Sequence, residues 1–135
     1  MTAKLLVGRV AAIHVYILMV EMLLWDKPYG RRVFGQSAES AAASKVLAAN
    51  QGLYNGFLAA GPVWGLSLGP AGHAVQLFVF GCVCVAGVAG VAGVAGVYGV
   101  AGVYGMYGAV TVGVKIMFLQ SVPAALAAAA VLRLG

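Results

Sequence analysis

The residues of this sequence that could do proton chemistry are a histidine and a glutamate inside its first apolar segment. His14 and Glu21 are seven residues apart, which is about 700° of helical rotation, so both would share one helix face. A charge in mid-membrane costs roughly 2.5–3.5 kcal/mol on insertion scales. We therefore expect Glu21 to face a bundle interior, near His14 or a polar group of the second apolar segment. The alternative is that Glu21, four residues before Trp25, lies at the membrane interface and reaches water.

The second apolar segment is unusually polar for a helix in lipid. Four polar side chains fall within six residues: Asn50, Gln51, Tyr54 and Asn55. Asn50 and Tyr54 stack on one helix face. Gln51 and Asn55 stack on the adjacent face. They could line a ligand pocket, or they could only hold helices together through interhelical hydrogen bonds. A separate set of small residues, four apart, would let another helix approach closely: Gly52, Gly56 and Ala60.

The last apolar segment offers a third polar face. Tyr107, Thr111 and Lys115 are each four residues apart, so they would lie above one another on a helix. Lys115 could complete a polar pocket, or it could extend its ammonium group to the membrane interface. The candidate pocket residues of the whole chain are therefore His14, Glu21, Asn50, Gln51, Tyr54, Asn55, Tyr107, Thr111 and Lys115.

The usual sequence patterns of zinc hydrolases, nucleotide-binding loops and redox dithiols are not found in this sequence. It contains no HExxH, P-loop or CxxC pattern. Cys82 and Cys84 are two residues apart, so in a helix they point about 200° apart and cannot form a disulfide with each other. We interpret both as small apolar packing residues. The sequence predicts no cofactor and no metal site, and it leaves open whether the protein is an enzyme.

Composition places the chain in a membrane. Hydrophobic residues make up 63% of its 135 residues and charged residues only 8%, with a mean hydropathy of +1.00. A soluble domain carries roughly 25% charge, because its surface must face water. The net charge of +5 does not indicate nucleic-acid binding, because the basic residues flank apolar runs, as membrane anchors do.

The apolar runs predict an all-α membrane protein, a single domain over 1–135 with about four transmembrane helices. The expected spans are residues 5–25, 45–66, 74–108 and 110–133, and a polar loop covers Asp26 to Ser44 with a turn at Pro28-Tyr29-Gly30. Five basic residues would share the side of this loop: Lys27, Arg31, Arg32, Lys45 and Lys115. Three would share the side of the termini: Lys4, Arg9 and Arg133. This asymmetry favours a cytoplasmic first loop and both termini outside.

A repeat extends the third expected span. Glycine recurs at every third residue from Gly87 to Gly108, within Val-Ala-Gly and Val-Tyr-Gly triplets. A three-residue step turns a helix by about 300°, so these glycines spiral around it and form no single packing stripe. The pattern is typical of a duplicated coding repeat. The extra length gives either an over-long third helix or a fifth span.

The chain resembles a small bacterial integral-membrane family, the domain-of-unknown-function family numbered 1304. The matching elements are His14-Val15-Tyr16, Glu21-Met22, Leu24-Trp25, Gly30-Arg31, Val33-Phe34-Gly35, the block Ala48 to Gly61, Gly81-Cys82-Val83, Val85-Ala86-Gly87, Tyr107-Gly108-Ala109 with Thr111, Lys115, Gln120, and Pro123-Ala124. The resemblance implies a four-helix inner-membrane protein and no particular activity. The family pattern lacks the repeat, so Ala86-Gly87 and Tyr107-Gly108 are separated here by 18 additional residues.

Three functions are compatible with these residues. The first is binding or transport of a small or amphipathic ligand in a polar pocket, with His14 and Glu21 as proton-responsive groups. The second is a membrane enzyme on a lipid-soluble substrate, with the same residues as acid and base. The third is a structural subunit of a larger membrane complex. The expected location is the inner (cytoplasmic) membrane, crossed several times, and the expected partners are the bilayer and a second copy or a larger membrane complex.

Overall fold

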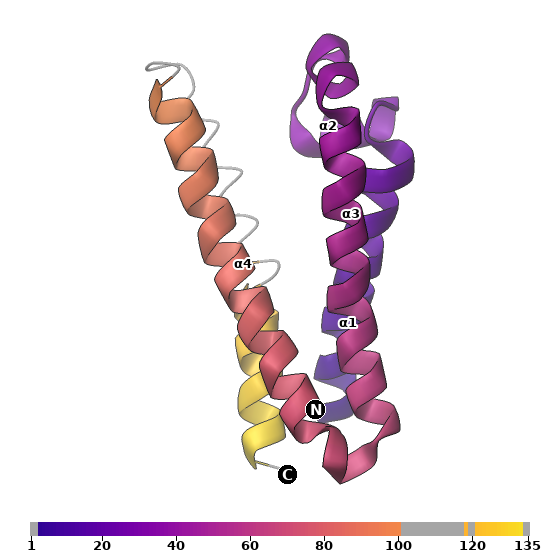
Figure 1. Ribbon diagram of the computed structural model, residues 1–135, viewed down its shortest axis with the longest axis vertical. Coiled ribbons are helices and arrows are strands. Elements are labelled where there is room, and N and C mark those ends of the chain that lie inside the picture. The colour runs from indigo at the N-terminus through magenta and orange to yellow at the C-terminus, as the bar shows by residue number, and fades with distance from the viewer. Residues whose placement is uncertain (1–2, 101–117, 119–120, 134–135) are drawn as a thin grey trace.

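The computed structural model describes residues 3–100, 118 and 121–133, and for 87–100 it describes the backbone alone (Figure 1). The described chain is almost entirely helical, as its composition predicts. Helix α1 (Ala3–Met19) continues directly into η1 (Val20–Leu24), a π-helical turn that contains Glu21. A π-helical turn holds one residue more than an α-helical turn, and such turns are frequent at functional sites. The segment expected as the first span is therefore one helical segment with a widened last turn.

The prediction of a polar loop from Asp26 to Ser44 is wrong, because most of this segment is helical. A short helix, α2 (Pro28–Phe34), begins at Pro28, where the fixed φ of proline suits the first helical position and its missing N–H costs nothing. The Pro28-Tyr29-Gly30 segment thus starts a helix and forms no turn. Helix α2 ends at Gly35, whose φ of 65° lies in the left-handed region that glycine adopts readily.

Helix α3 (Ala38–Ser67) is longer than the expected second span. It begins early because the Ser37 hydroxyl accepts a hydrogen bond from the Ser40 backbone N–H at 3.1 Å, which caps the helix. Its 30 residues correspond to about 45 Å. Pro62 lies inside the helix and is buried, and the helix continues through it.

A tight connection joins α3 to α4. The 3₁₀ turn η2 (Gly69–Gly72) leads into α4 (His73–Val100), which is continuous through the first part of the glycine repeat. Gly72 lies directly against the backbone of Gly65, and a Cβ built on Gly72 would be 1.9 Å from the Gly65 carbonyl oxygen. Glycine at both positions is what allows the two helices to approach here.

The C-terminal helix, Ser121–Arg133, packs against the first half of α4. The Ser121 hydroxyl donates to the Cys84 carbonyl oxygen at 3.4 Å, and the Cys84 thiol lies 3.7 Å from the Ser121 carbonyl oxygen. Cys82 and Cys84 are both free thiols, as their spacing predicts. The buried core joins α1, α4 and the C-terminal helix through Val7, Val10, Phe80, Val83, Ala124, Ala127 and Val131.

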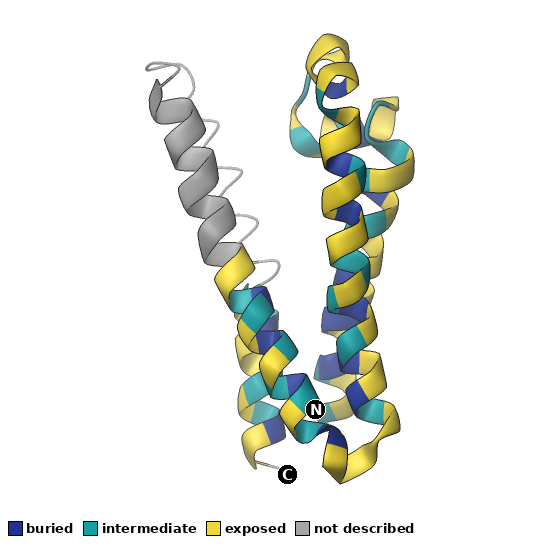
Figure 2. Ribbon diagram, in the orientation of Figure 1, coloured by how far each residue is buried: buried dark blue, intermediate teal, exposed yellow. Residues whose placement is uncertain are grey.

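The helices form two arms that meet at one end of the molecule. Helices α1 and α3 run side by side, while α4 diverges from α3 with increasing distance from η2 (Figure 1). Residues 73–86 of α4 and the C-terminal helix both carry buried residues near the junction of the arms (Figure 2). The N- and C-termini lie at this same end, and α2 lies at the opposite end of the α1–α3 arm (Figure 1).

Two segments of the described chain are long and apolar enough to cross a membrane: Ala3–Leu24 and Gly69–Ala86. Helix α3 is long enough, but its polar residues between Asn50 and Asn55 set it apart from these two. The C-terminal helix is apolar, although it is shorter than a span. The structure thus gives an all-helical protein with two candidate membrane spans.

Candidate functional site

Glu21 meets a polar side chain of α3, as its position in an apolar helix predicts. Its Oε2 accepts a hydrogen bond from Asn55 Nδ2 at 2.9 Å, and both side chains are partly buried. The same amide nitrogen of Asn55 lies 3.1 Å from the Gln51 carbonyl oxygen. The carboxyl group of η1 is thereby connected through one amide to the backbone of α3.

Small residues of α3 hold α1 close enough for this bond. Gly52 is buried, and a Cβ on it would meet Met22 Cγ at 2.5 Å and the Leu18 carbonyl oxygen at 3.2 Å. A Cβ on Gly56 would meet Leu18 Cδ1 at 2.8 Å. The close approach expected at these two glycines is confirmed. The prediction that Ala60 belongs to the same packing surface is wrong. Ala60 is exposed, and Ala59 is buried in its place.

His14 lies on the interior side of α1 and is completely buried. Its Nδ1 lies 2.8 Å from the Val10 carbonyl oxygen, to which it can donate. Its Nε2 is also buried and has no hydrogen-bond partner among the residues that the structure describes. Glu21 lies in the π-helical turn that follows α1. Seven residues separate it from His14 by about 10 Å along the axis, and each makes its described hydrogen bond to another group.

The polar residues of α3 divide between two sides of the helix. Asn55 faces α1, while Asn50, Gln51 and Tyr54 are exposed to different degrees on the remaining surface. The Tyr54 ring is 52% exposed and packs against the exposed ring of Phe57, with 6.4 Å between the ring centroids. The structure therefore brings Glu21 and Asn55 together and places the other three polar side chains elsewhere.

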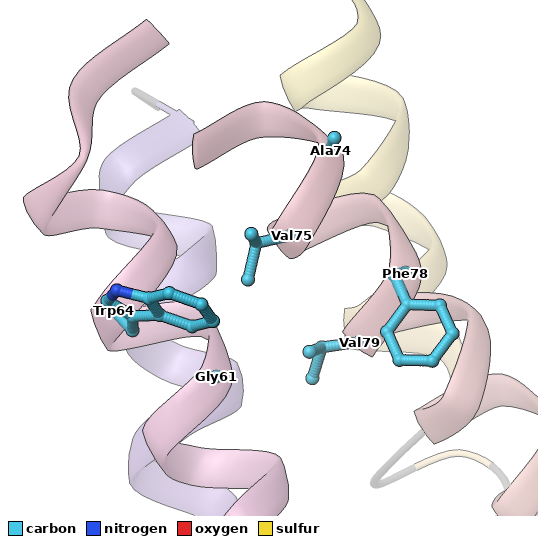
Figure 3. Close-up of a pocket in the computed structure, with 6 residues that line it drawn as sticks. All are labelled: Gly61, Trp64, Ala74, Val75, Phe78 and Val79. Atoms are coloured by element: carbon cyan, nitrogen blue, oxygen red, sulfur yellow. The ribbon is translucent and has the colours of Figure 1, made fainter. Parts of the chain in front are cut away.

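A shallow groove of about 430 Å³, open along much of its length and called the cavity below, lies between α3 and α4, close to η2. Its lining consists of Gly61, Trp64, Ala74, Val75, Phe78 and Val79 (Figure 3). The walls are almost wholly apolar. The indole ring of Trp64 presents its carbon edge to Val75 and Val79, and its nitrogen points away from them (Figure 3). This cavity suits an alkyl chain and offers no polar group to anchor one.

The exposed polar residues of α3 continue the wall of this cavity. At about 100° per residue, five side-chain positions fall within about 80° of one another on α3. They are Asn50, Tyr54, Phe57, Gly61 and Trp64, which we call the open face of α3. Its lower end contacts α4, because a Cβ on Gly61 would lie 2.6 Å from Val79 Cγ2. Higher up α4 diverges (Figure 1), and Tyr54 and Phe57 are 52% and 60% exposed.

Two lysines close to the N-terminal half of α3 are paired with one carboxylate on the side away from this face. Lys45 is seven residues before Gly52, so it shares the side of α3 that faces α1. Its ammonium group donates to Asp26 Oδ2 at 2.8 Å, and Lys27 lies 3.8 Å from the other oxygen. Because it accepts the hydrogen bond from Lys45, Asp26 has a pKa below its ordinary value.

Three of the predicted pocket residues, Tyr107, Thr111 and Lys115, lie outside the described residues. The apolar lining of the cavity was missed by sequence reasoning, because Val, Ala and Phe on a membrane helix carry no signal that separates a cavity from ordinary packing. Within the part of the chain that the structure describes, no three histidine, cysteine or carboxylate side chains gather as metal ligands would.

A family model described as "Protein of unknown function (DUF1304)" matches residues 8–132, which is nearly the whole sequence. No curated protein and no solved structure matches the chain. The family match agrees with the resemblance seen in the sequence and carries no activity.

Proposed function

The chain belongs to the DUF1304 family, whose description assigns no activity, and from its geometry we propose that it binds an amphipathic molecule between α3 and α4. The alkyl chain would lie in the apolar cavity beside Trp64 and Phe78. The polar end would lie against Asn50 and Tyr54, higher on the open face of α3. The observation that carries this proposal is the continuity of the face, which begins at an apolar cavity and ends in an amide and a phenol.

The dimensions of the open face suit a single alkyl chain with a polar end. Asn50 and Trp64 are 14 residues apart, which is about 21 Å along the helix. Phe57 and Gly61 fill the distance between them, so an extended chain would meet aromatic and apolar surface throughout. Ligand sites in general pair an apolar wall with a few placed polar groups.

Two features favour binding over the other functions that the sequence left open. An enzyme on this chain would need its acid and base to face one substrate, whereas Glu21 and His14 are about 10 Å apart along α1 and each bonds to another group. A purely structural subunit would need satisfied amides and no cavity. Asn50 is exposed and a cavity of about 430 Å³ is present.

The binding proposal can be tested by the fluorescence of Trp64. The chain has two tryptophans, so Trp25→Phe leaves Trp64 as the single reporter. We expect a dibrominated single-chain alcohol, titrated into the detergent-solubilised protein, to quench Trp64 saturably. Phe78→Ala removes the aromatic wall of the cavity from an exposed position and should raise the half-saturation concentration about tenfold. Phe118→Ala, at an exposed position outside the cavity, is the matched control. Equal half-saturation in both alanine variants would disprove the site.

We also propose that the protein is a multi-pass protein of the inner (cytoplasmic) membrane with four spans and both termini outside. The described termini share one end of the molecule (Figure 1), and Lys27, Arg31 and Arg32 lie at or next to α2 at the other end. With Cys82 and Cys84 replaced by alanine, Ala38→Cys should resist a membrane-impermeant maleimide in intact cells, and Arg133→Cys should react. The reverse pattern would invert the orientation.

A further inference from the structure

The open face of α3 differs from the rest of the α3 surface in its charge. Its polar groups are one amide, Asn50, and one phenol, Tyr54, and both are neutral hydrogen-bonding groups. The remaining positions are Phe57, Gly61 and Trp64. The face therefore holds hydrogen-bond donors and acceptors without any cation.

Among the residues that the structure describes, the cation of α3 closest in sequence to Asn50 is directed away from this face. Lys45 lies on the α1 side of the helix and is bound to Asp26 at 2.8 Å, and Lys27 approaches the same carboxylate at 3.8 Å. The nearest charge on the face itself is negative. Glu39 is 11 residues before Asn50, which returns it to within about 20° of the same direction at about 16 Å along the axis.

We infer that the amphipathic molecule bound at α3 and α4 is an uncharged lipid whose head carries hydroxyl or amide groups. This inference rests on the proposed binding function and specifies its ligand class. Asn50 can both donate and accept a hydrogen bond, and the Tyr54 hydroxyl can do the same, so the pair matches a head that also donates and accepts.

A phospholipid is a poor match to the same face. Its ionised phosphate would leave the headgroup layer for a surface on which the described residues provide no basic partner, and an ion moved to an apolar setting without a counter-charge is strongly disfavoured. An uncharged head does not carry this cost.

The ligand class can be tested with three dibrominated lipids that have the same chains and different heads. The probes are a diacylglycerol, a phosphatidylcholine and a phosphatidylglycerol, each titrated into the solubilised Trp25→Phe protein while Trp64 fluorescence is recorded. We expect diacylglycerol to reach half-maximal quenching at a concentration at least tenfold below that of either phospholipid. Saturable quenching of equal strength by all three, or strongest by phosphatidylglycerol, would overturn the ligand class and leave the binding site standing. Quenching that saturates with none of them would remove the binding function itself.

Two variants connect the preference to the residues that carry it. Tyr54→Phe removes one hydroxyl from an exposed ring, and Asn50→Leu removes one exposed amide; neither opens the buried core. Each should reduce the preference for diacylglycerol about threefold or more, with little change for phosphatidylcholine. Tyr29→Phe is the matched control, because the Tyr29 hydroxyl lies on α2 and bonds to the Tyr16 hydroxyl at 3.0 Å. If both variants keep the preference for diacylglycerol unchanged, the open face of α3 does not recognise the lipid head.

Discussion

At the scale of single residues, the cost of an unpaired carboxyl group in an apolar helix predicts the partner of Glu21. That argument needed only the residue type and its position, and the hydrogen bond to Asn55 at 2.9 Å confirms it. The argument could not select Asn55 over Asn50, Gln51 or Tyr54, because the choice depends on which side of α3 contacts α1. Helical spacing alone does not determine how α3 is rotated about its axis relative to α1. The burial of Ala59, where Ala60 was expected, shows the same limit.

The Glu21–Asn55 bond leads to a prediction for stability. Glu21→Gln should be tolerated, because an amide still accepts a hydrogen bond from Asn55. Glu21→Leu leaves Asn55 without this acceptor and should lower the free energy of unfolding by roughly 1–3 kcal/mol. Thermal unfolding in detergent would measure both, with Glu39→Gln at an exposed site as the control. If the leucine variant were as stable as the glutamine variant, the bond would contribute nothing.

The ion pair of Asp26 leads to a prediction for pH dependence. The folded protein holds the pKa of Asp26 below its ordinary value of 3.8, mainly through the hydrogen bond from Lys45. A lowered pKa in the folded state means that the contribution to stability is present above the unfolded pKa and is lost as pH falls through the folded pKa. The stability difference between the native protein and Asp26→Asn should therefore be small at neutral pH, as for other exposed ion pairs, and absent well below the ordinary value of 3.8. A difference that grows on acidification would contradict this assignment.

At the scale of elements, apolar runs located the helices in the interior of the chain better than they located the helix ends. The first span was expected from Leu5 to Trp25 and is observed as α1 and η1 from Ala3 to Leu24. The segment between the first two spans was misassigned because its polar residues suggested a loop. Pro28 at a first helical position and the Ser37 cap make it helical, and both are local signals that composition overlooks.

The junction of α3 and α4 leads to a prediction about two glycines. Gly72→Ala would drive a Cβ to within 1.9 Å of a backbone oxygen that cannot rotate away, so we expect a loss of about 1–3 kcal/mol, as for other overpacked sites. Gly81→Ala in α4 meets no atom within 4 Å and should gain up to about 1 kcal/mol from helix propensity. Chemical unfolding of the two variants beside the native chain gives the comparison. Equal effects would show that α3 and the start of α4 do not touch at Gly72.

At the scale of the whole molecule, composition predicted an all-helical protein and could not predict how the helices diverge. The α3–α4 cavity depends on how α4 diverges from α3 (Figure 1), and no residue type marks that divergence in the sequence. The glycine repeat shows the same limit. The described part of α4 is helical to Val100, so no turn lies in the first part of the repeat. Its 28 residues correspond to about 42 Å, which exceeds a hydrocarbon layer of about 30 Å.

The length of the repeat leads to a prediction about removing it. Deleting the 18 residues from Val88 to Gly105 removes a length that equals five whole turns of an α-helix, about 27 Å, so a helix that runs across the joined ends keeps its phase. The joined sequence, Ala86-Gly87-Met106-Tyr107-Gly108, restores the uninterrupted family pattern. The open face of α3 and the cavity residues all precede the deletion. We therefore expect the shortened protein to insert, to accumulate like the native chain and to retain saturable quenching of Trp64.

Membrane fractionation with immunoblotting, and the Trp64 titration in the Trp25→Phe background, would measure these outcomes. A deletion shorter by one residue, Val88 to Tyr104, is the matched control, because it rotates the downstream residues by about 100° relative to α4. Where the intervening residues transmit this rotation, the Ser121–Arg133 helix turns away from Cys84 and accumulation falls. Degradation of the longer deletion while the native protein accumulates would mean that the repeat itself supports the fold. Equal accumulation of both deletions would mean that helical phase across the repeat is not transmitted to the C-terminal helix.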